Sequence, residues 1–64
     1  MRESELWRRL EAHFGHVYAH SWAGQVVLAE LGGRTVDEAI DSGITFKEIW
    51  LAVWRHEELP ESER

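Results

Sequence analysis

Apolar residues recur at helical spacing at the start of the chain. Four of them lie three or four residues apart, and they are Leu6, Trp7, Leu10 and Phe14. A period of about 3.6 residues predicts an amphipathic helix with one buried face. Ser4 stands where a capping hydroxyl is expected, and Gly15 follows the last apolar residue, where a left-handed C-terminal cap is common.

A second apolar segment predicts a helix that begins at Val17 or Tyr18 and ends at Leu31. Its main stripe is expected to contain Tyr18, Trp22, Val26 and Ala29. Three more apolar side chains widen this surface, namely Val27, Leu28 and Leu31. Such a broad apolar surface indicates a central helix that packs on more than one side. Gly32 and Gly33 are expected to end it.

Two capping boxes follow in close succession. Thr35-Val-Asp-Glu38 and Thr45-Phe-Lys-Glu48 both have the pattern S/T-x-x-E, in which a hydroxyl and a carboxylate satisfy free amides at a helix start. Gly43 lies between them and is suited to a tight turn. The pattern predicts a short helix over residues 36–42 and a longer one over residues 46–57.

The last predicted helix has its inward stripe at Phe46, Ile49, Trp50 and Val53. Pro60 ends the regular structure, and the polar tail after it is expected to fray. No segment alternates between apolar and polar residues as a half-buried strand would. The sequence therefore predicts a single all-α domain over residues 1–64, a small three-to-four-helix bundle with a helix-turn-helix-like C-terminal corner.

Composition narrows the functional classes. With 64 residues the core is small, so we expect most of the four tryptophans to belong to it. The absence of cysteine excludes disulfides and thiolate zinc sites. No apolar run approaches the ~20 residues of a membrane helix, and the charged N-terminus does not resemble a signal peptide. We expect a cytoplasmic protein with no membrane contact.

The predicted corner invites comparison with a DNA-reading helix-turn-helix. Four residues fit the small-residue, turn-glycine and apolar positions of that motif, and they are Ala39, Gly43, Ile44 and Ile49. Ser42 does not fit, because an apolar residue is expected there. A purely structural corner would need the same four residues.

Charge separates these two interpretations. Affinity for DNA comes mainly from basic contacts to phosphate, and the chain has a net charge of −5. The first helix of the pair carries Asp37, Glu38 and Asp41 and no base. The second offers Lys47 and Arg55 against Glu48, Glu57 and Glu58. We therefore favour a structural corner and keep a DNA-binding helix-turn-helix, using residues 35–57, as the alternative.

Three histidines lie close together in the sequence, at His13, His16 and His20. Imidazoles on neighbouring turns can bind Zn²⁺, Ni²⁺ or Cu²⁺. Natural structural sites hold four ligands, and only Glu11 is at hand as a fourth. Metal binding is thus a third hypothesis, and we assign no metal or other cofactor.

The sequence contains no recognisable catalytic constellation. His20 and Ser21 are adjacent, so on a helix their side chains point about 100° apart. Glu57 and Glu58 lie at an exposed helix end, where burial would not raise their pKa values. The Gly32-Gly33 pair follows a helix, whereas a phosphate-binding loop follows a strand. We do not expect an enzyme.

The outer side of the last helix is the predicted partner-binding surface. Its candidate residues are Lys47, Leu51, Trp54 and Arg55. An aromatic residue combined with arginine is typical of interface hot spots. Alternatively, Trp54 folds over the edge of the core and Leu59 covers the remainder. The predicted partner is an unidentified protein, and the chain itself is expected to be a monomer or a weak homodimer.

The chain resembles a family of small actinobacterial proteins known only as a domain of unknown function, number thirty forty-six. The resemblance rests on LWRRLEAHFG at 6–15, YAHSWAGQVVLAELGGRTVDEAI at 18–40 and G-x-x-x-KEIW-x-AV from Gly43 to Val53. It implies a helical protein and no established activity. Family members are often encoded beside the recombinase RecA and its regulator RecX, which implies a link to DNA recombination or repair.

This sequence departs from the family pattern at several positions. The histidines at 13, 16 and 20 are not part of the pattern. Phe46 stands where proline is frequent, and Trp54 where cysteine is frequent. From the residues and the resemblance together, the predicted function is a non-catalytic protein-interaction module.

Overall fold

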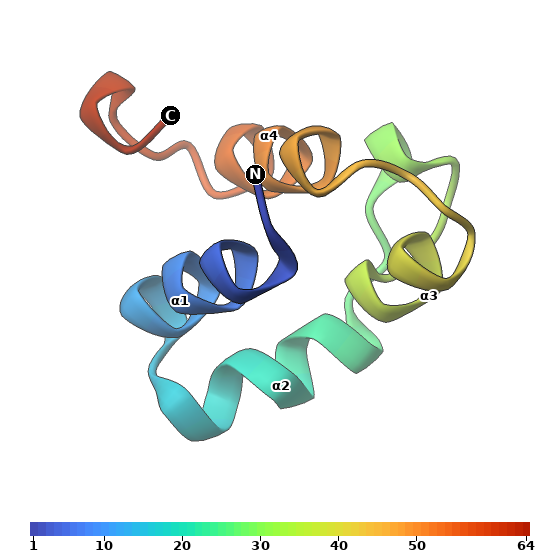
Figure 1. The fold of residues 1–64 in the computed structure, drawn as a ribbon, viewed down its shortest axis with the longest axis horizontal. Coiled ribbons are helices and arrows are strands. Elements are labelled where there is room, and N and C mark those ends of the chain that lie inside the picture. The colour runs from blue at the N-terminus through green and yellow to red at the C-terminus, as the bar shows by residue number, and fades with distance from the viewer.

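The computed structural model describes residues 1–64, which form four α-helices and two short 3₁₀ turns. The helices are α1 (Glu3–Phe14), α2 (His16–Gln25), α3 (Val36–Asp41) and α4 (Phe46–His56), and the turns are η1 (Ala29–Leu31) and η2 (Glu61–Glu63). The helices make a closed circuit, in which α1 and α3 each contact both α2 and α4 (Figure 1). The all-α prediction is confirmed.

The core lies where the inner faces of the four helices meet. Its largest fully buried side chains are Trp50, Leu6, Leu10, Leu28, Ile49, Val36 and Val53. Trp22 and Trp50 are buried, and Trp7 and Trp54 are half-buried against the same cluster. All four tryptophans thus contribute to one core, as expected for a chain with little other apolar surface to bury.

Helix α1 has the predicted apolar face, with Leu6 and Leu10 fully buried. The predicted Ser4 cap is wrong, because the helix begins at Glu3 and Ser4 lies within its first turn. Gly15 has the expected positive φ of 92°, but its ψ of 153° is extended and not left-handed. The chain therefore turns at Gly15 directly into α2.

Helix α2 is shorter than predicted, because it ends at Gln25 and not at Leu31. Val26 is already extended, and Leu28 pairs with Arg34 in an isolated antiparallel bridge. This turn buries Leu28 and Leu31, and Gly32 and Gly33 take the positive φ angles that it requires.

The stripe predicted for α2 is only partly confirmed, because Trp22 is buried but Ala29 is exposed. The buried residues of α2 are Ala19, Trp22 and Ala23, while Tyr18 is 58% exposed. The physical reason is that the short helix packs through two alanines, which allow a close approach to its neighbours. Gly24 is the point of close contact with α3, since a Cβ there would lie 3.2 Å from the Asp37 carboxylate.

The two capping sites form helix starts as predicted. Thr35 has the full capping box, in which its hydroxyl accepts from the Glu38 amide and the Glu38 carboxylate accepts from the Thr35 amide. Thr45 has half of it, since its hydroxyl accepts from the Glu48 amide at 3.2 Å. The helix bounds differ from the predicted 36–42 and 46–57 by one residue each.

The tail after Pro60 is not frayed, contrary to the prediction. Its η2 turn is bonded to both α4 and α1, because Trp50 donates to the Glu63 main-chain oxygen and Arg9 to that of Arg64. Sequence periodicity could not show this, because the bonds that hold the tail run from side chains of α1 and α4 to its main chain. None of the four helices has the length and apolar character needed to cross a bilayer.

Candidate functional site

The four predicted partner-binding residues lie on the outer side of α4, but they face two different surfaces. Leu51 and Arg55 line a groove between α4 and the segment around η1. Lys47 and Trp54 instead contact the tail. At 100° per residue, Leu51 and Arg55 lie about 40° and 80° around the helix axis from Lys47, whereas Trp54 lies about 20° to its other side.

The first surface, which we call the α4 groove, has a volume of about 520 Å³. Nine residues line it, namely Glu30, Leu31, Gly32, Arg34, Ile44, Glu48, Leu51, Ala52 and Arg55. Leu31 and Ala52 are buried, and Ile44 and Leu51 are half-buried. The groove is therefore lined by four apolar residues, four charged residues of both signs and one glycine, and more of its exposed surface is polar than apolar.

Three local features shape the rim of this groove. The Arg55 guanidinium lies 2.9 Å from the Glu30 carboxylate, and both side chains are about half exposed. The Arg34 guanidinium donates to the main-chain oxygen of Leu31 at 3.0 Å. Gly32 allows this bond, because a Cβ at that position would collide with the Arg34 guanidinium. The Glu48 carboxylate forms no hydrogen bond or ion pair, so the rim keeps one free acid.

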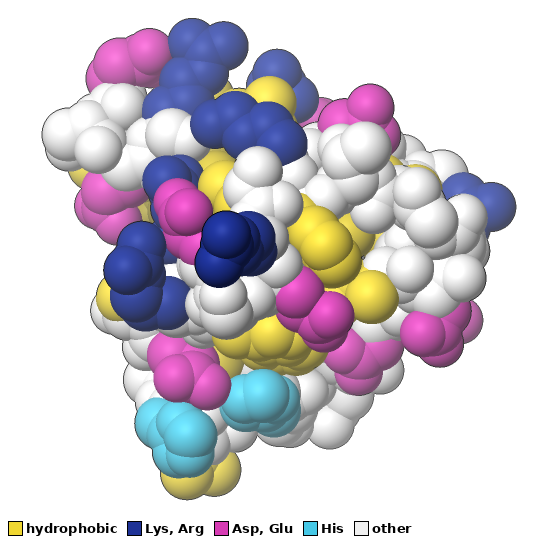
Figure 2. Space-filling view, in the orientation of Figure 1, with side chains coloured by type: hydrophobic (Ala, Val, Ile, Leu, Met, Phe, Trp, Pro, Cys, Tyr) yellow, Lys and Arg dark blue, Asp and Glu magenta, His cyan; other side chains and the backbone are white.

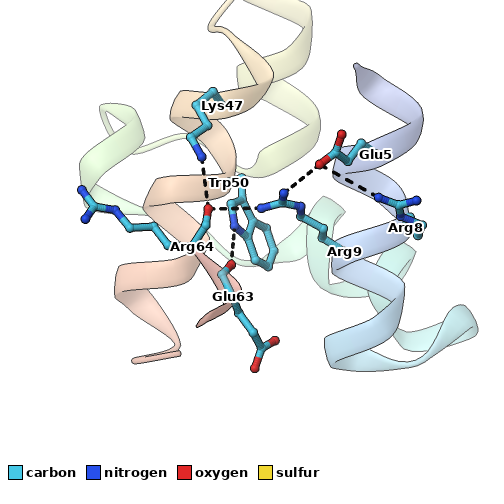
Figure 3. A network of polar contacts seen from close by, with 7 residues as sticks. All are labelled: Glu5, Arg8, Arg9, Lys47, Trp50, Glu63 and Arg64. Carbon is cyan, nitrogen blue, oxygen red and sulfur yellow. Dashed lines mark hydrogen bonds and ion pairs between the residues drawn. The ribbon is translucent and has the colours of Figure 1, made fainter. Parts of the chain in front are cut away.

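The second surface, which we call the tail seam, consists of Arg9, Lys47, Trp50 and Trp54. The indole nitrogens of Trp50 and Trp54 donate to the main-chain oxygens of Glu63 and Pro60, each at 2.9 Å. Arg9 and Lys47 both donate to the main-chain oxygen of Arg64 at 3.1 Å (Figure 3). All the donors belong to α1 and α4, and all the acceptors are main-chain oxygens of the tail.

Trp54 is therefore engaged with the chain itself. It packs against the core, it holds Pro60, and the Arg64 guanidinium lies 5.4 Å from its ring centroid. Leu59 is half-buried beside the core, and its amide donates to the Trp54 carbonyl at 3.1 Å. This arrangement matches the alternative in which Trp54 covers the edge of the core, and it leaves Leu51 and Arg55 as the residues available in the groove.

The histidines form two separate groups, each around one glutamate. His16 and His20 lie 3.3 and 3.0 Å from the Glu11 carboxylate. His13 and His56 lie 3.1 and 3.0 Å from the Glu57 carboxylate. The predicted set of His13, His16 and His20 is thus not brought together, and no group of three or more possible ligands is placed to hold a metal ion.

These contacts change the acidity of both carboxylates. Hydrogen bonds from His20 and then His16 hold the pKa of Glu11 below its usual value. For Glu57, burial acts to raise the pKa, but the hydrogen bonds from His13 and His56 outweigh it and the pKa is lowered. Sequence reasoning missed the Glu57 group, because its members come from opposite ends of the chain.

The predicted corner between α3 and α4 is formed. Ala39 and Ile49 are buried, Gly43 has a φ of 84°, and the Ile44 amide donates to the Ala39 carbonyl at 3.1 Å. Ser42 is exposed, so it does not pack between the two helices as the apolar residue expected at that position would. Both bases of α4 are already bound within the chain, Lys47 to the tail and Arg55 to Glu30.

Basic residues are unevenly distributed over the surface. Arg8, Arg9, Lys47 and Arg64 are linked around Glu5 and the tail (Figure 3). Figure 2 shows Lys and Arg side chains gathered over the side where the tail and α1 lie, with acidic groups among them. On the face that Figure 2 shows, basic side chains thus gather around the tail and α1.

Comparison with known proteins finds one match. The sequence profile of a family described as "Protein of unknown function (DUF3046)" matches residues 1–62. No curated protein matches the chain, and no solved structure matches it.

Proposed function

The chain belongs to the DUF3046 family of proteins of unknown function, and we propose that it is a non-catalytic protein-interaction module of the cytoplasm that binds its partner in the α4 groove. The observation that carries this proposal is that the groove brings the half-buried side chains of Ile44 and Leu51 together with charged groups of both signs.

The groove combines apolar and charged side chains in one hollow. Its volume of about 520 Å³ can accept one or two apolar side chains of a partner. Leu51 is the half-buried apolar residue nearest the middle of α4, and Arg55 adds the planar guanidinium that is frequent in interface hot spots. The charged rim would select the partner and its orientation more than it would add affinity.

The charges on the rim also indicate what the partner should carry. Arg55 and Glu30 already form an ion pair, so a partner gains little from either alone. Glu48 has a free carboxylate in the same groove as the apolar side chains. A partner segment that presents an apolar side chain followed by a lysine or arginine would satisfy both features.

Site-specific photo-crosslinking tests this proposal. A photoreactive residue at Leu51 should form a discrete adduct with one protein in cells, and the same residue at the exposed Val17 on α2 should not. RecA and RecX are the first candidates, because the family resemblance implies a link to recombination or repair. Equal adducts from both positions, or none from position 51, would refute binding in the groove.

DNA binding by the α3–α4 corner is the second candidate. The observation in its favour is that Ala39, Gly43, Ile44 and Ile49 do assemble the predicted corner. The acidic groups of α3 and the internal pairing of Lys47 and Arg55 weigh against it. Titration of labelled protein with mixed-sequence duplex DNA at low salt separates the two. Salt-reversible amide shifts confined to residues 45–55 would favour the DNA binder.

A further inference from the structure

Helix α2 is the only α-helix of the fold that contains no aspartate, glutamate, lysine or arginine. Each of the other three contains at least three such residues. The outer side of α2 is nevertheless open to solvent, and Val17 and Tyr18 are 82% and 58% exposed on it. A helix at the surface of a globular protein normally has charged and polar residues on its outer side. An uncharged outer side with exposed apolar residues therefore indicates a contact surface.

We call this surface the α2 face, and it consists of the seven exposed residues of the helix, namely His16, Val17, Tyr18, His20, Ser21, Gly24 and Gln25. Val17 lies at its centre. At 100° per residue, Gly24 and Ser21 lie about 20° and 40° around the helix axis from Val17, on opposite sides of it. The residues that α2 buries lie at least about 120° away from Val17. The middle of the face thus has one projecting valine in line with two small residues.

The two ends of the α2 face differ in their titratable groups. His16 and His20 lie toward the N-terminal end, where Glu11 contacts Nδ1 of His16 and Nε2 of His20. The second ring nitrogen of each histidine forms no hydrogen bond or ion pair within the chain. At the C-terminal end, the Asp37 carboxylate lies over Gly24, 3.2 Å from the position that a Cβ would take there. This carboxylate also forms no hydrogen bond or ion pair.

We propose that the α2 face binds the α2 face of a second copy of this chain, with the two helices antiparallel about a two-fold axis that crosses both at right angles. In this arrangement Val17 of each copy lies over Gly24 of the other, where no Cβ keeps the helices apart. His16 and Gly24 lie on the same side of Val17 around the helix axis. The two-fold axis therefore also brings His16 of each copy next to Asp37 of the other.

A second copy is the occupant that the charges favour, because the α2 face is complementary to itself. Each histidine end meets a free carboxylate, and a protonated imidazole can donate to two carboxylates, one from each ring nitrogen. The chain has a net charge of −5, so two copies repel one another in most orientations. The middle of the α2 face is free of formal charge, and contact through it avoids placing like charges opposite each other.

The size of the face predicts a weak dimer. Helix α2 has ten residues and is thus about 15 Å long. One such face offers less than the ~800 Å² that each partner contributes to a standard interface. We expect a dissociation constant on the order of 0.1 mM, so that about four fifths of the chains are paired at 1 mM and about one quarter at 20 µM.

This inference does not depend on the proposed function, because it concerns a different surface. Helices α2 and α4 lie on opposite sides of the circuit of helices (Figure 1). A photoreactive residue at Val17 would join two identical chains of 7.5 kDa, and the mass of that product distinguishes it from an adduct with another protein. Only adducts with another protein bear on the α4 groove.

Sedimentation equilibrium of the full-length chain tests the proposal. Samples labelled with ¹⁵N and ranging from about 20 µM to 1 mM are measured at about pH 6, where histidine side chains are largely protonated. We expect the average mass to rise from that of one chain toward that of two. Amide spectra of the same samples should show shifts that grow with concentration at residues 16–25 and at Asp37.

Two matched variants locate the contact. Val17→Glu and Leu51→Glu add the same charge on opposite sides of the molecule. Val17→Glu should weaken the dimer at least about tenfold, because the contact would bury an unpaired carboxylate. Leu51→Glu should dimerise as the natural chain does. Val17 is 82% exposed, so its replacement should leave the fold intact, and the amide spectrum checks this.

Charge reversal tests the antiparallel arrangement. His16→Asp and Asp37→Lys each place like charges opposite one another, and each should weaken the dimer about fivefold. The double variant restores opposite charges and should dimerise within about twofold of the natural chain. Residues 16 and 24 lie roughly 12 Å apart along α2, so the rescue requires two chains. The lost contact with Glu11 is common to His16→Asp and the double variant and does not affect their comparison.

Three results would overturn the inference. The first is a mass that stays at that of one chain at 1 mM, and an adduct of Val17 with another protein would then assign the face to that protein. The second is concentration-dependent shifts that avoid α2, or equal weakening by Val17→Glu and Leu51→Glu. The third is a double variant that dimerises no better than His16→Asp alone, which would exclude the antiparallel contact.

Discussion

The indole nitrogen of Trp50 lies 2.9 Å from the main-chain oxygen of Glu63, although its ring is buried in the core. One side chain thus joins the centre of the bundle to the last residues of the chain. Arg9 lies over the same ring, with its guanidinium carbon 5.5 Å from the centroid. The tail is therefore attached to the core and not only to the surface.

Replacement of Trp50 by phenylalanine should free the tail and weaken the core together. The lost hydrogen bond contributes about 1 kcal/mol, and the smaller ring leaves a cavity that costs roughly 1–2 kcal/mol more. Urea denaturation measures the total loss. Amide hydrogen exchange at residues 61–64 should also become faster, and unchanged exchange there would show that the indole does not hold the tail.

Trp54→Phe is the matched control for that variant. Trp54 also donates to the tail, at Pro60, but it is only half-buried. We expect a loss of about 1 kcal/mol, mainly from the hydrogen bond. A loss as large as that of Trp50→Phe would mean that Trp54 belongs to the core proper.

The lowered pKa values of Glu11 and Glu57 predict a loss of stability in acid. A carboxylate with a lower pKa in the folded state stabilises the fold at a pH above its unfolded value of 4.5. This contribution disappears as the pH falls below 4.5 and through the folded pKa. The melting temperature should therefore drop over that interval.

The variant Glu57→Gln should make this drop shallower, because the glutamine cannot titrate. Glu48→Gln is the control, since the Glu48 carboxylate has no partner in the fold. Melting curves recorded between about pH 3 and pH 6 give the comparison. Parallel curves for Glu57→Gln and the natural chain would contradict the role of the His13–Glu57–His56 group.

The two capping threonines should differ in their contribution to stability. Thr35 is 7% exposed and has both bonds of the capping box, whereas Thr45 is exposed and has one. Thr35→Ala should cost about 1–2 kcal/mol and Thr45→Ala about 0.5–1 kcal/mol. Chemical denaturation measures the loss of stability in both variants. A larger loss for Thr45→Ala than for Thr35→Ala would show that the start of α4 depends more on its cap than the start of α3 does.

Zinc should leave the melting temperature unchanged. His13 is bound to Glu57, and His16 and His20 share Glu11, so the three imidazoles do not converge. A ligand that binds only the folded chain raises its melting temperature by mass action. If added Zn²⁺ raises the melting temperature and His16→Ala abolishes this increase, the metal hypothesis would be supported.

The helices that follow local rules could be predicted from the sequence. The faces of α1 and α4 and the starts of α3 and α4 depend on periodicity and on residues three or four positions apart. The end of α2 could not be predicted, because Leu28 leaves the helix to pair with Arg34 and to reach the core. The point at which α2 ends depends on packing between segments that are distant in the sequence. Local helix propensity carries no information about such packing.

The candidate site was predictable to a similar extent. The outer face of α4 follows from helical geometry, and it contains Lys47, Leu51, Trp54 and Arg55. The division of these residues between a groove and a seam depends on η1 and on the tail. Neither η1 nor the tail has a periodic pattern of apolar residues. The hydrogen bonds that hold the tail are accepted by main-chain oxygens, which every residue has.

Amide NMR of the labelled full-length chain, titrated with the protein captured at position 51, tests the central claim most directly. The account predicts that shifts concentrate on the groove, at residues 30–34 and 44–55, and that Leu51→Glu abolishes them. A control variant, Val17→Glu on the exposed side of α2, should bind as the natural chain does. Shifts that avoid the groove, or that survive Leu51→Glu, would contradict the assignment of this surface to a protein partner.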